Sequence, residues 1–190
     1  MLPRIGSSKF VSHWILLTLA ASIIAALDGG WLWQWAALEP AKVWHGEVWR
    51  LATWPLIEGG PLALVFTCLA IYKFGGELAV VWGDQRLWRF ARRVVLAASV
   101  VTCVLAALTG GGHLHRLGGC AVADALVIAW ARQFPQRGLT LYGLVTLRGR
   151  DLVTVTVGVA VLFALYFGPI ATAPELVACL AAAAYPRGLL

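Results

Sequence analysis

Apolar stretches recur along the whole chain and are separated by short polar segments. They predict about six helical spans, at residues 13–27, 61–81, 94–108, 118–131, 152–167 and 170–185. Several stretches are shorter than the ~20 apolar residues of a usual membrane crossing. Such short spans indicate a locally thinned bilayer or helices that begin below its surface. The pattern therefore predicts an all-α polytopic membrane helix bundle that forms a single domain over residues 1–190.

The composition excludes a soluble domain. Hydrophobic residues make up 61% of the chain and charged residues 13%, and the mean hydropathy is +0.81. A soluble domain does not reach these values, because it must cover its core with polar surface. We therefore expect the chain to lie in a lipid bilayer. The small size and the wealth of Ala, Arg and Trp favour a bacterial inner (cytoplasmic) membrane.

Basic residues gather in the loops on one side of a six-span arrangement. They are Arg4, Lys9, Arg86, Arg89, Arg92, Arg93, Arg132, Arg137, Arg148, Arg150 and Arg187. Lys and Arg near span ends concentrate on the cytoplasmic side, so both termini are expected to be cytoplasmic. This asymmetry accounts for the net charge of +6, and no nucleic-acid partner is expected.

A long segment rich in tryptophan, residues 28–60, separates the first two spans. It is too polar to cross the membrane and contains Trp31, Trp33, Trp35, Trp44, Trp49 and Trp54. Indole rings prefer the headgroup layer, where the ring is buried and the N–H stays hydrated. We expect a large interfacial first loop.

Cysteine and histidine offer little chemistry by their spacing. The four cysteines, Cys68, Cys103, Cys120 and Cys179, lie in apolar spans without C-x-x-C spacing, which favours small buried side chains over disulfides or zinc. His113 and His115, with His13 or His45, are a candidate metal or haem site, against the simpler interpretation of a polar glycine-rich loop. We predict no metal and no cofactor.

Two runs carry a resemblance to a known family. They are "GEVWRLATWPLIEGG" and "FGGELAVVWGDQRLWRF". Together they resemble the rhomboid superfamily, including its derlin branch, which has a Trp-Arg pair in a long first loop and a G-x-E-L-x-x-x-x-G signature at the end of the second span. The matching positions are Trp49 and Arg50, and Gly75, Glu77 and Gly83. The resemblance implies that Arg50 bonds backbone carbonyls of the loop, and Glu77 is expected to pair with an arginine such as Arg86 or to cap a helix.

Active rhomboids are serine proteases, but the positions that carry their chemistry differ in this chain. The family's serine motif G-x-S-G falls on Gly118, Gly119, Cys120 and Ala121, and the His and Asn of its second span fall on Ala63 and Thr67. The sixth span contains no histidine to act as base. A nucleophile without a base is not activated, so we expect a catalytically inactive pseudoprotease.

Asp124 lies one helical turn below Cys120, on nearly the same face. A carboxylate in a span costs ~2.5–3.5 kcal/mol on insertion scales, so it is expected to face the bundle interior. Thr67 is a candidate hydrogen-bond partner and Lys73 a candidate ion partner. A structural hydrogen bond is favoured over a proton or ligand role.

Three functions remain from the sequence. The leading one is an inactive rhomboid-like protein that binds partner transmembrane segments or serves as a subunit of a membrane complex. The alternative is a cysteine-based intramembrane protease or transferase that uses Cys120 with His113 or His115. Transport or local thinning of the bilayer ranks last, because no row of polar residues marks a pathway.

Overall fold

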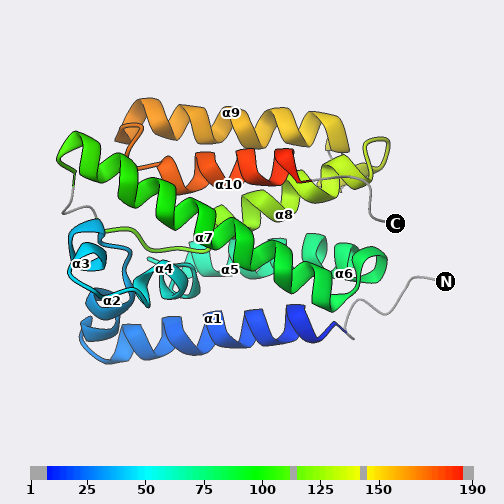
Figure 1. Cartoon of the computed structure of the whole chain (residues 1–190). Helices are drawn as coiled ribbons and strands as arrows, with labels where there is room; N and C mark the ends of the chain where they lie inside the picture. Colours follow the sequence, from blue (N-terminus) through cyan, green and yellow to red (C-terminus); the bar gives the residue numbers. More distant parts are fainter. Residues whose placement is uncertain (1–7, 112–114, 142–144, 186–190) are drawn as a thin grey trace.

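The computed structural model describes residues 8–111, 115–141 and 145–185, which form the predicted bundle of helices (Figure 1). The helices are α1 (Lys9–Leu27), α2 (Trp31–Ala36), α3 (Pro40–Trp44), α4 (Arg50–Thr53), the 3-10 turn η2 (Trp54–Leu56), α5 (Pro61–Ala70), the π-helical turn η3 (Ile71–Gly75), α6 (Gly76–Trp82), α7 (Asp84–Thr109), α8 (Cys120–Gln133), α9 (Gly149–Phe167) and α10 (Ala173–Ala184). A short antiparallel hairpin of β1 (Gly138–Leu141) and β2 (Val145–Arg148) pairs Gly138 with Arg148 and was not predicted.

Four of the described helical stretches are long and apolar enough to cross a membrane: α1, the continuous run Pro61–Trp82, α7 and α9. The other two predicted spans are the shorter helices α8 and α10, with 14 and 12 residues. At 1.5 Å per residue they are about 21 and 18 Å long, less than the ~30 Å of a hydrocarbon core. The six predicted spans are therefore all helical, but two of them are too short to cross alone.

Helix α8 lies at the centre of the bundle. All its residues from Ala121 to Ala131 are buried except Asp124. Helices α7, α9 and α10 pack against it, as does α5 with η3. Figure 1 shows α1 and α9 at opposite edges of the bundle, with α7, α8 and α10 between them.

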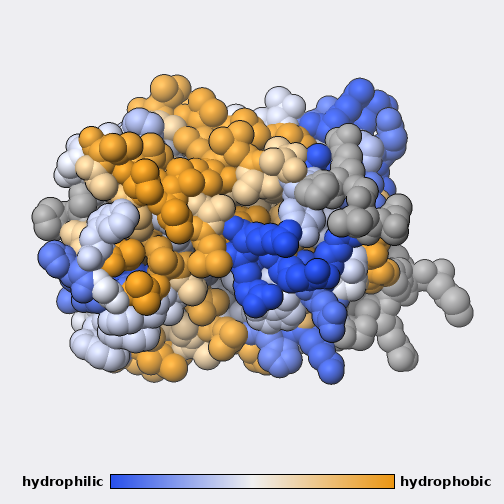
Figure 2. All heavy atoms as spheres, viewed as in Figure 1, coloured by the Kyte–Doolittle hydropathy of each residue, from blue (hydrophilic) through white to orange (hydrophobic). Residues whose placement is uncertain are grey.

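The surface is apolar where lipid would cover it. In α9 only 11% of the span is buried inside the protein, and Leu162, Phe163 and Tyr166 are among its exposed side chains. Figure 2 shows apolar residues over much of one face, with hydrophilic residues concentrated toward one end. This surface is that of an integral membrane protein rather than of a domain in water.

Residues 28–60 fold into short helices at one end of the bundle and are held there by Arg50. Its side chain is 3% exposed and donates hydrogen bonds to the carbonyl oxygens of Gln34 (2.6 Å) and Ala37 (2.7 Å), while its Nε donates to the Glu47 carboxylate at 2.6 Å. This is the arrangement that the family resemblance implies for the Trp49-Arg50 pair. The indoles of Trp31, Trp35 and Trp49 stack on one another at the exposed surface.

At the opposite end, α1 and α7 begin side by side. Ser8 caps α1 by accepting a hydrogen bond from the Val11 N–H, and its hydroxyl donates to Asp84 at 2.6 Å. Gly83 has φ +75°, in the left-handed region that favours glycine, and so separates α6 from α7. The start of α1 and the end of α10 also lie at this end (Figure 1).

Candidate functional site

Helix α8 begins at two glycines whose backbone is tightly engaged. Gly118 has φ +120°, a conformation that other residues rarely adopt, and its N–H donates to the carbonyl oxygen of Trp54 at 3.1 Å. The N–H of Gly119 donates to Glu58 Oε1 at 2.7 Å in a buried hydrogen bond. The two amides just before Cys120 therefore both bind the segment from Trp54 to Glu58.

Glu58 is a buried carboxylate at the N-terminus of a 14-residue helix. Its side chain is 4% exposed, and its own backbone N–H donates to the Ser22 hydroxyl of α1 at 3.0 Å. The first amides of a helix lack intrahelical acceptors and carry partial positive charge, so they stabilise a carboxylate. One residue thus joins α1, the first loop and α8.

Glu58 was missed by the sequence analysis, although it stands in the run "WPLIEGG" that carries the family resemblance. A lone acid between apolar residues and two glycines was the available signal. The sequence does not show that this acid reaches the start of a helix 61 positions further along the chain.

Gly119 is required by close packing as well as by its hydrogen bond. A Cβ placed there would lie 2.8 Å from Thr67 Cγ2, 3.0 Å from Glu58 Oε1 and 3.0 Å from the Pro55 carbonyl oxygen. Gly75 in the second span is also closely packed: a Cβ placed there would be in van der Waals contact with the side chains of Val11 and Leu126. The glycines of the two motifs therefore let the second span, the first loop and α8 approach one another.

Of the positions that align with the catalytic residues of the rhomboid superfamily, Thr67 lies beside Cys120. Thr67 is buried in α5 and its side chain interacts with the Cys120 thiol, while Ala63 is half-buried one turn earlier. Cys120 itself is exposed, and Ala121 is buried beside it. A thiol therefore stands at the position where the rhomboid superfamily, which the sequence resembles, has a serine hydroxyl.

Acidic rather than basic groups surround the thiol. Asp124 on α8, Glu175 on α10 and Glu58 all interact electrostatically with Cys120. Glu175 also pairs with Arg116 at 3.0 Å. Cys179 of α10 lies near the carboxylates of Asp124 and Glu175 as well. In the described part of α10 no residue is a histidine, as the sequence shows.

Neither suggested partner of Asp124 is bonded to it among the described residues. Lys73 instead forms an ion pair with Glu77 at 2.6 Å. Glu77 also pairs with Arg137 at 3.0 Å and accepts a hydrogen bond from the Trp130 indole at 2.7 Å. Glu77 therefore does pair with an arginine, but that arginine is Arg137, whereas Arg86 lies over the ring of Trp82.

The loop before α8 is fastened to the first loop. Leu38 and Arg116 form an antiparallel backbone bridge, and His115 Nε2 lies 3.1 Å from Glu39 Oε2. The structure thus places His115 against Glu39; His113 lies outside the described residues. Among the described residues no group of three His, Cys, Asp or Glu side chains is placed to hold a metal ion.

Burial would raise the pKa of Glu39, but the hydrogen bond from Lys42 and the charges of His115, Lys42 and Arg50 hold it below its ordinary value. Lys42 Nζ lies 2.8 Å from Glu39 Oε2. The carboxylate is therefore ionised in the folded protein and links the first loop to the loop before α8.

Comparison with known families matches residues 9–187 to the family described as eukaryotic integral membrane protein (DUF1751). The match covers nearly the whole chain, so the protein belongs to this family. A comparison with curated proteins gives no match.

The expectation of a bacterial inner membrane is wrong, because the family is described as eukaryotic. The expectation rested on the content of Ala, Arg and Trp. These residues satisfy any bilayer and its interfaces, so their abundance does not identify the organism or the compartment.

Replacing Gly119 with Ala is expected to lower the free energy of unfolding by about 2 kcal/mol, because the new methyl group overpacks the contact with Thr67. Denaturant titration in mixed micelles measures it. The matched control is Gly158→Ala in α9, where no atom lies within 4 Å of the new Cβ and the change is expected to be neutral or stabilising. Adding Thr67→Ser to Gly119→Ala removes the Cγ2 atom of Thr67 and should recover part of the lost stability. Equal changes in stability for Gly119→Ala and Gly158→Ala would contradict the packing described here.

Stability is expected to fall in acid through Glu39. Because folding lowers the pKa of Glu39, its ionised carboxylate contributes fully to the free energy of unfolding above the ordinary pKa of 4.5. This contribution to stability is lost as the pH falls through the lowered pKa. Melting curves recorded from neutral to acidic pH test this. In Glu39→Gln the melting temperature should fall less steeply with decreasing pH than in wild type. An equally steep fall in that variant would show that Glu39 does not cause the acid sensitivity.

Proposed function

We propose that this chain is a catalytically inactive rhomboid-like membrane protein that binds partner transmembrane segments. The observation that carries the proposal is the Glu58 carboxylate on the Gly119 N–H. Acyl-transfer enzymes use free amide donors beside the nucleophile to bind the negative oxygen of the transition state. A carboxylate bound to such a donor places negative charge where an enzyme needs positive potential.

The groups around Cys120 support the same proposal. A thiol attacks as its anion, which cationic neighbours or a base normally stabilise. Here the neighbouring charges are the carboxylates of Glu58, Asp124 and Glu175. His115, the described histidine nearest to Cys120 in the sequence, lies with its Nε2 3.1 Å from Glu39 Oε2.

The binding role is supported by the exposed side of α5, the helix that carries Thr67 next to Cys120. Helix α5 packs on α8 and on α1. On α5, Leu64 and Cys68 are half-buried and lie toward one side of Thr67, whereas Leu62 and Phe66 are exposed on the other. A helix from a partner would therefore meet an apolar face beside the exposed Cys120.

A photo-cross-linking amino acid in place of Phe66 is expected to capture the partner in native membranes. The matched control is Leu16 on α1, which is similarly exposed, at 64% against 59%, but lies on a helix that does not flank Cys120. The adducts are identified by mass spectrometry. Cross-links of equal yield from both positions would indicate contact with membrane proteins at random and would contradict a docking face.

The alternative enzyme is favoured by one feature, the exposure of Cys120. Under the proposal, Cys120→Ala leaves the length and amount of the captured partner unchanged, because no covalent step takes place. Cleavage of the partner by the wild-type protein, abolished in Cys120→Ala and retained in Cys68→Ala, would establish a cysteine protease instead.

A further inference from the structure

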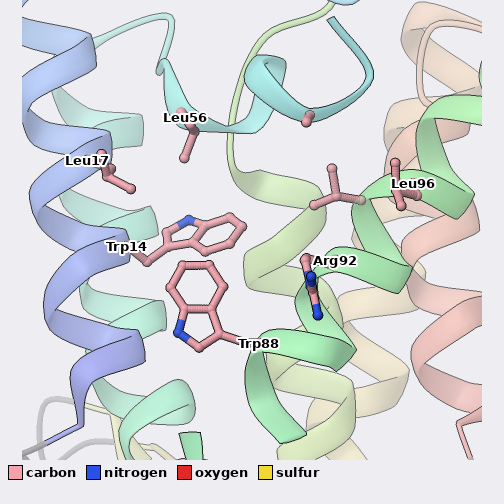
Figure 3. Close-up of a pocket in the computed structure, with 8 residues that line it drawn as sticks. Trp14, Leu17, Leu56, Trp88, Arg92 and Leu96 are labelled. Carbon is pink, nitrogen blue, oxygen red and sulfur yellow. The ribbon is translucent and has the colours of Figure 1, made fainter. Parts of the chain in front are cut away.

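A groove of about 260 Å³ lies between α1 and α7, away from Cys120. Figure 3 shows the indoles of Trp14 and Trp88 meeting between the two helices, with Leu56 of the first loop above them. The other walls come from Leu17, Ala52, Val95 and Leu96. From Trp88 to Leu96 the groove follows α7 for about 12 Å at 1.5 Å per residue. Its apolar walls and its length suit an extended hydrocarbon chain.

One cation borders these apolar walls. Arg92 lines the groove, is exposed, and has no ion-pair or hydrogen-bond partner among the described residues. In Figure 3 its side chain points toward the Trp88 end, where α7 begins. A guanidinium binds phosphate oxygens in a planar, two-pronged geometry, so a phosphate at this end would pair with Arg92.

The aromatic pair adds a second polar group. The Trp14 and Trp88 rings lie 5.7 Å apart, and Trp88 also packs edge-on against Phe10. Trp14 is 5% exposed, and its indole N–H has no acceptor among the described residues. Indoles with one apolar and one polar side are typical of the region where lipid headgroups meet acyl chains.

Other occupants fit the groove poorly. A transmembrane helix is about 10 Å wide and needs a longer face than the 12 Å available here. A free phosphate would leave the apolar walls uncovered. The volume lies below the ~300–1,000 Å³ of pockets for compact drug-sized ligands, which favours a single chain over a bulky ring system.

We infer that this groove binds one phospholipid with an anionic headgroup, from the leaflet next to the basic start of α7. One acyl chain lies between α1 and α7 toward Leu56, and the phosphate pairs with Arg92. The site is separate from the proposed partner face on α5, so each can fail without the other.

The test is a titration of the purified full chain with phosphatidylserine or phosphatidylcholine, followed by native mass spectrometry, which resolves the first bound lipid. Phosphatidylserine is expected to bind the wild type more tightly than phosphatidylcholine does. Arg92→Gln should weaken its binding about fivefold to tenfold, the effect of roughly one lost cationic contact. The matched control is Arg93→Gln, the next residue of the same helix, which is exposed and does not line the groove.

A second pair of variants tests the acyl chain. Leu17→Phe places a larger side chain in the groove and should weaken both lipids, while Leu16→Phe, exposed on the same helix outside the groove, should weaken neither. Equal losses in Arg92→Gln and Arg93→Gln would mean general attraction to a basic surface and would overturn the site. If inorganic phosphate competes with lipid binding and Leu17→Phe has no effect on it, the groove binds an anion only and the proposed acyl-chain site is wrong.

Discussion

The hydrogen bond from the Gly119 N–H to the buried Glu58 carboxylate is the contact on which the central architecture depends. This bond joins the first loop to the start of α8. The backbone N–H of Glu58 also donates a hydrogen bond to the Ser22 hydroxyl of α1. An ionised side chain is costly to bury unless its charge is compensated. The helix N-terminus provides that compensation, and the glycines at positions 118 and 119 allow the carboxylate to come within range.

Several other charged side chains are paired in the same way, because a bilayer offers no water to unpaired groups. Arg50 is buried with three acceptors, and the half-buried Glu77 is bound by Lys73, Arg137 and the Trp130 indole. Arg116 and Glu175 pair between the α8 entrance and α10. These ion pairs and hydrogen bonds join segments that lie far apart in the sequence.

Much of the fold was predictable because lipid imposes a simple pattern on sequence. The second span, for example, was expected at residues 61–81 and is helical over Pro61–Trp82. The third was placed too late, at residue 94, because the arginines at the start of α7 resemble a loop, although the helix begins at Asp84. The hairpin is too short and its residues too mixed to give a period-two signal.

The site was only partly predictable. The glycines and Arg50 belong to motifs with fixed spacing, so their positions could be read from the chain. The partners of Glu58, Glu39 and Glu77 could not, because each long-range bond depends on which helices lie side by side. Asp124 shows the same limit: its position within the span was evident from the sequence, but its expected ion partner Lys73 pairs with Glu77 instead.

The most direct test of the account is amide hydrogen exchange at Gly119, measured by NMR in wild type and in Glu58→Ala. The account predicts a protected Gly119 amide in wild type and a selective loss of protection in the variant, while amides in the middle of α7 stay protected. A Gly119 amide that exchanges as fast in wild type as in Glu58→Ala would show that the carboxylate does not occupy the start of α8.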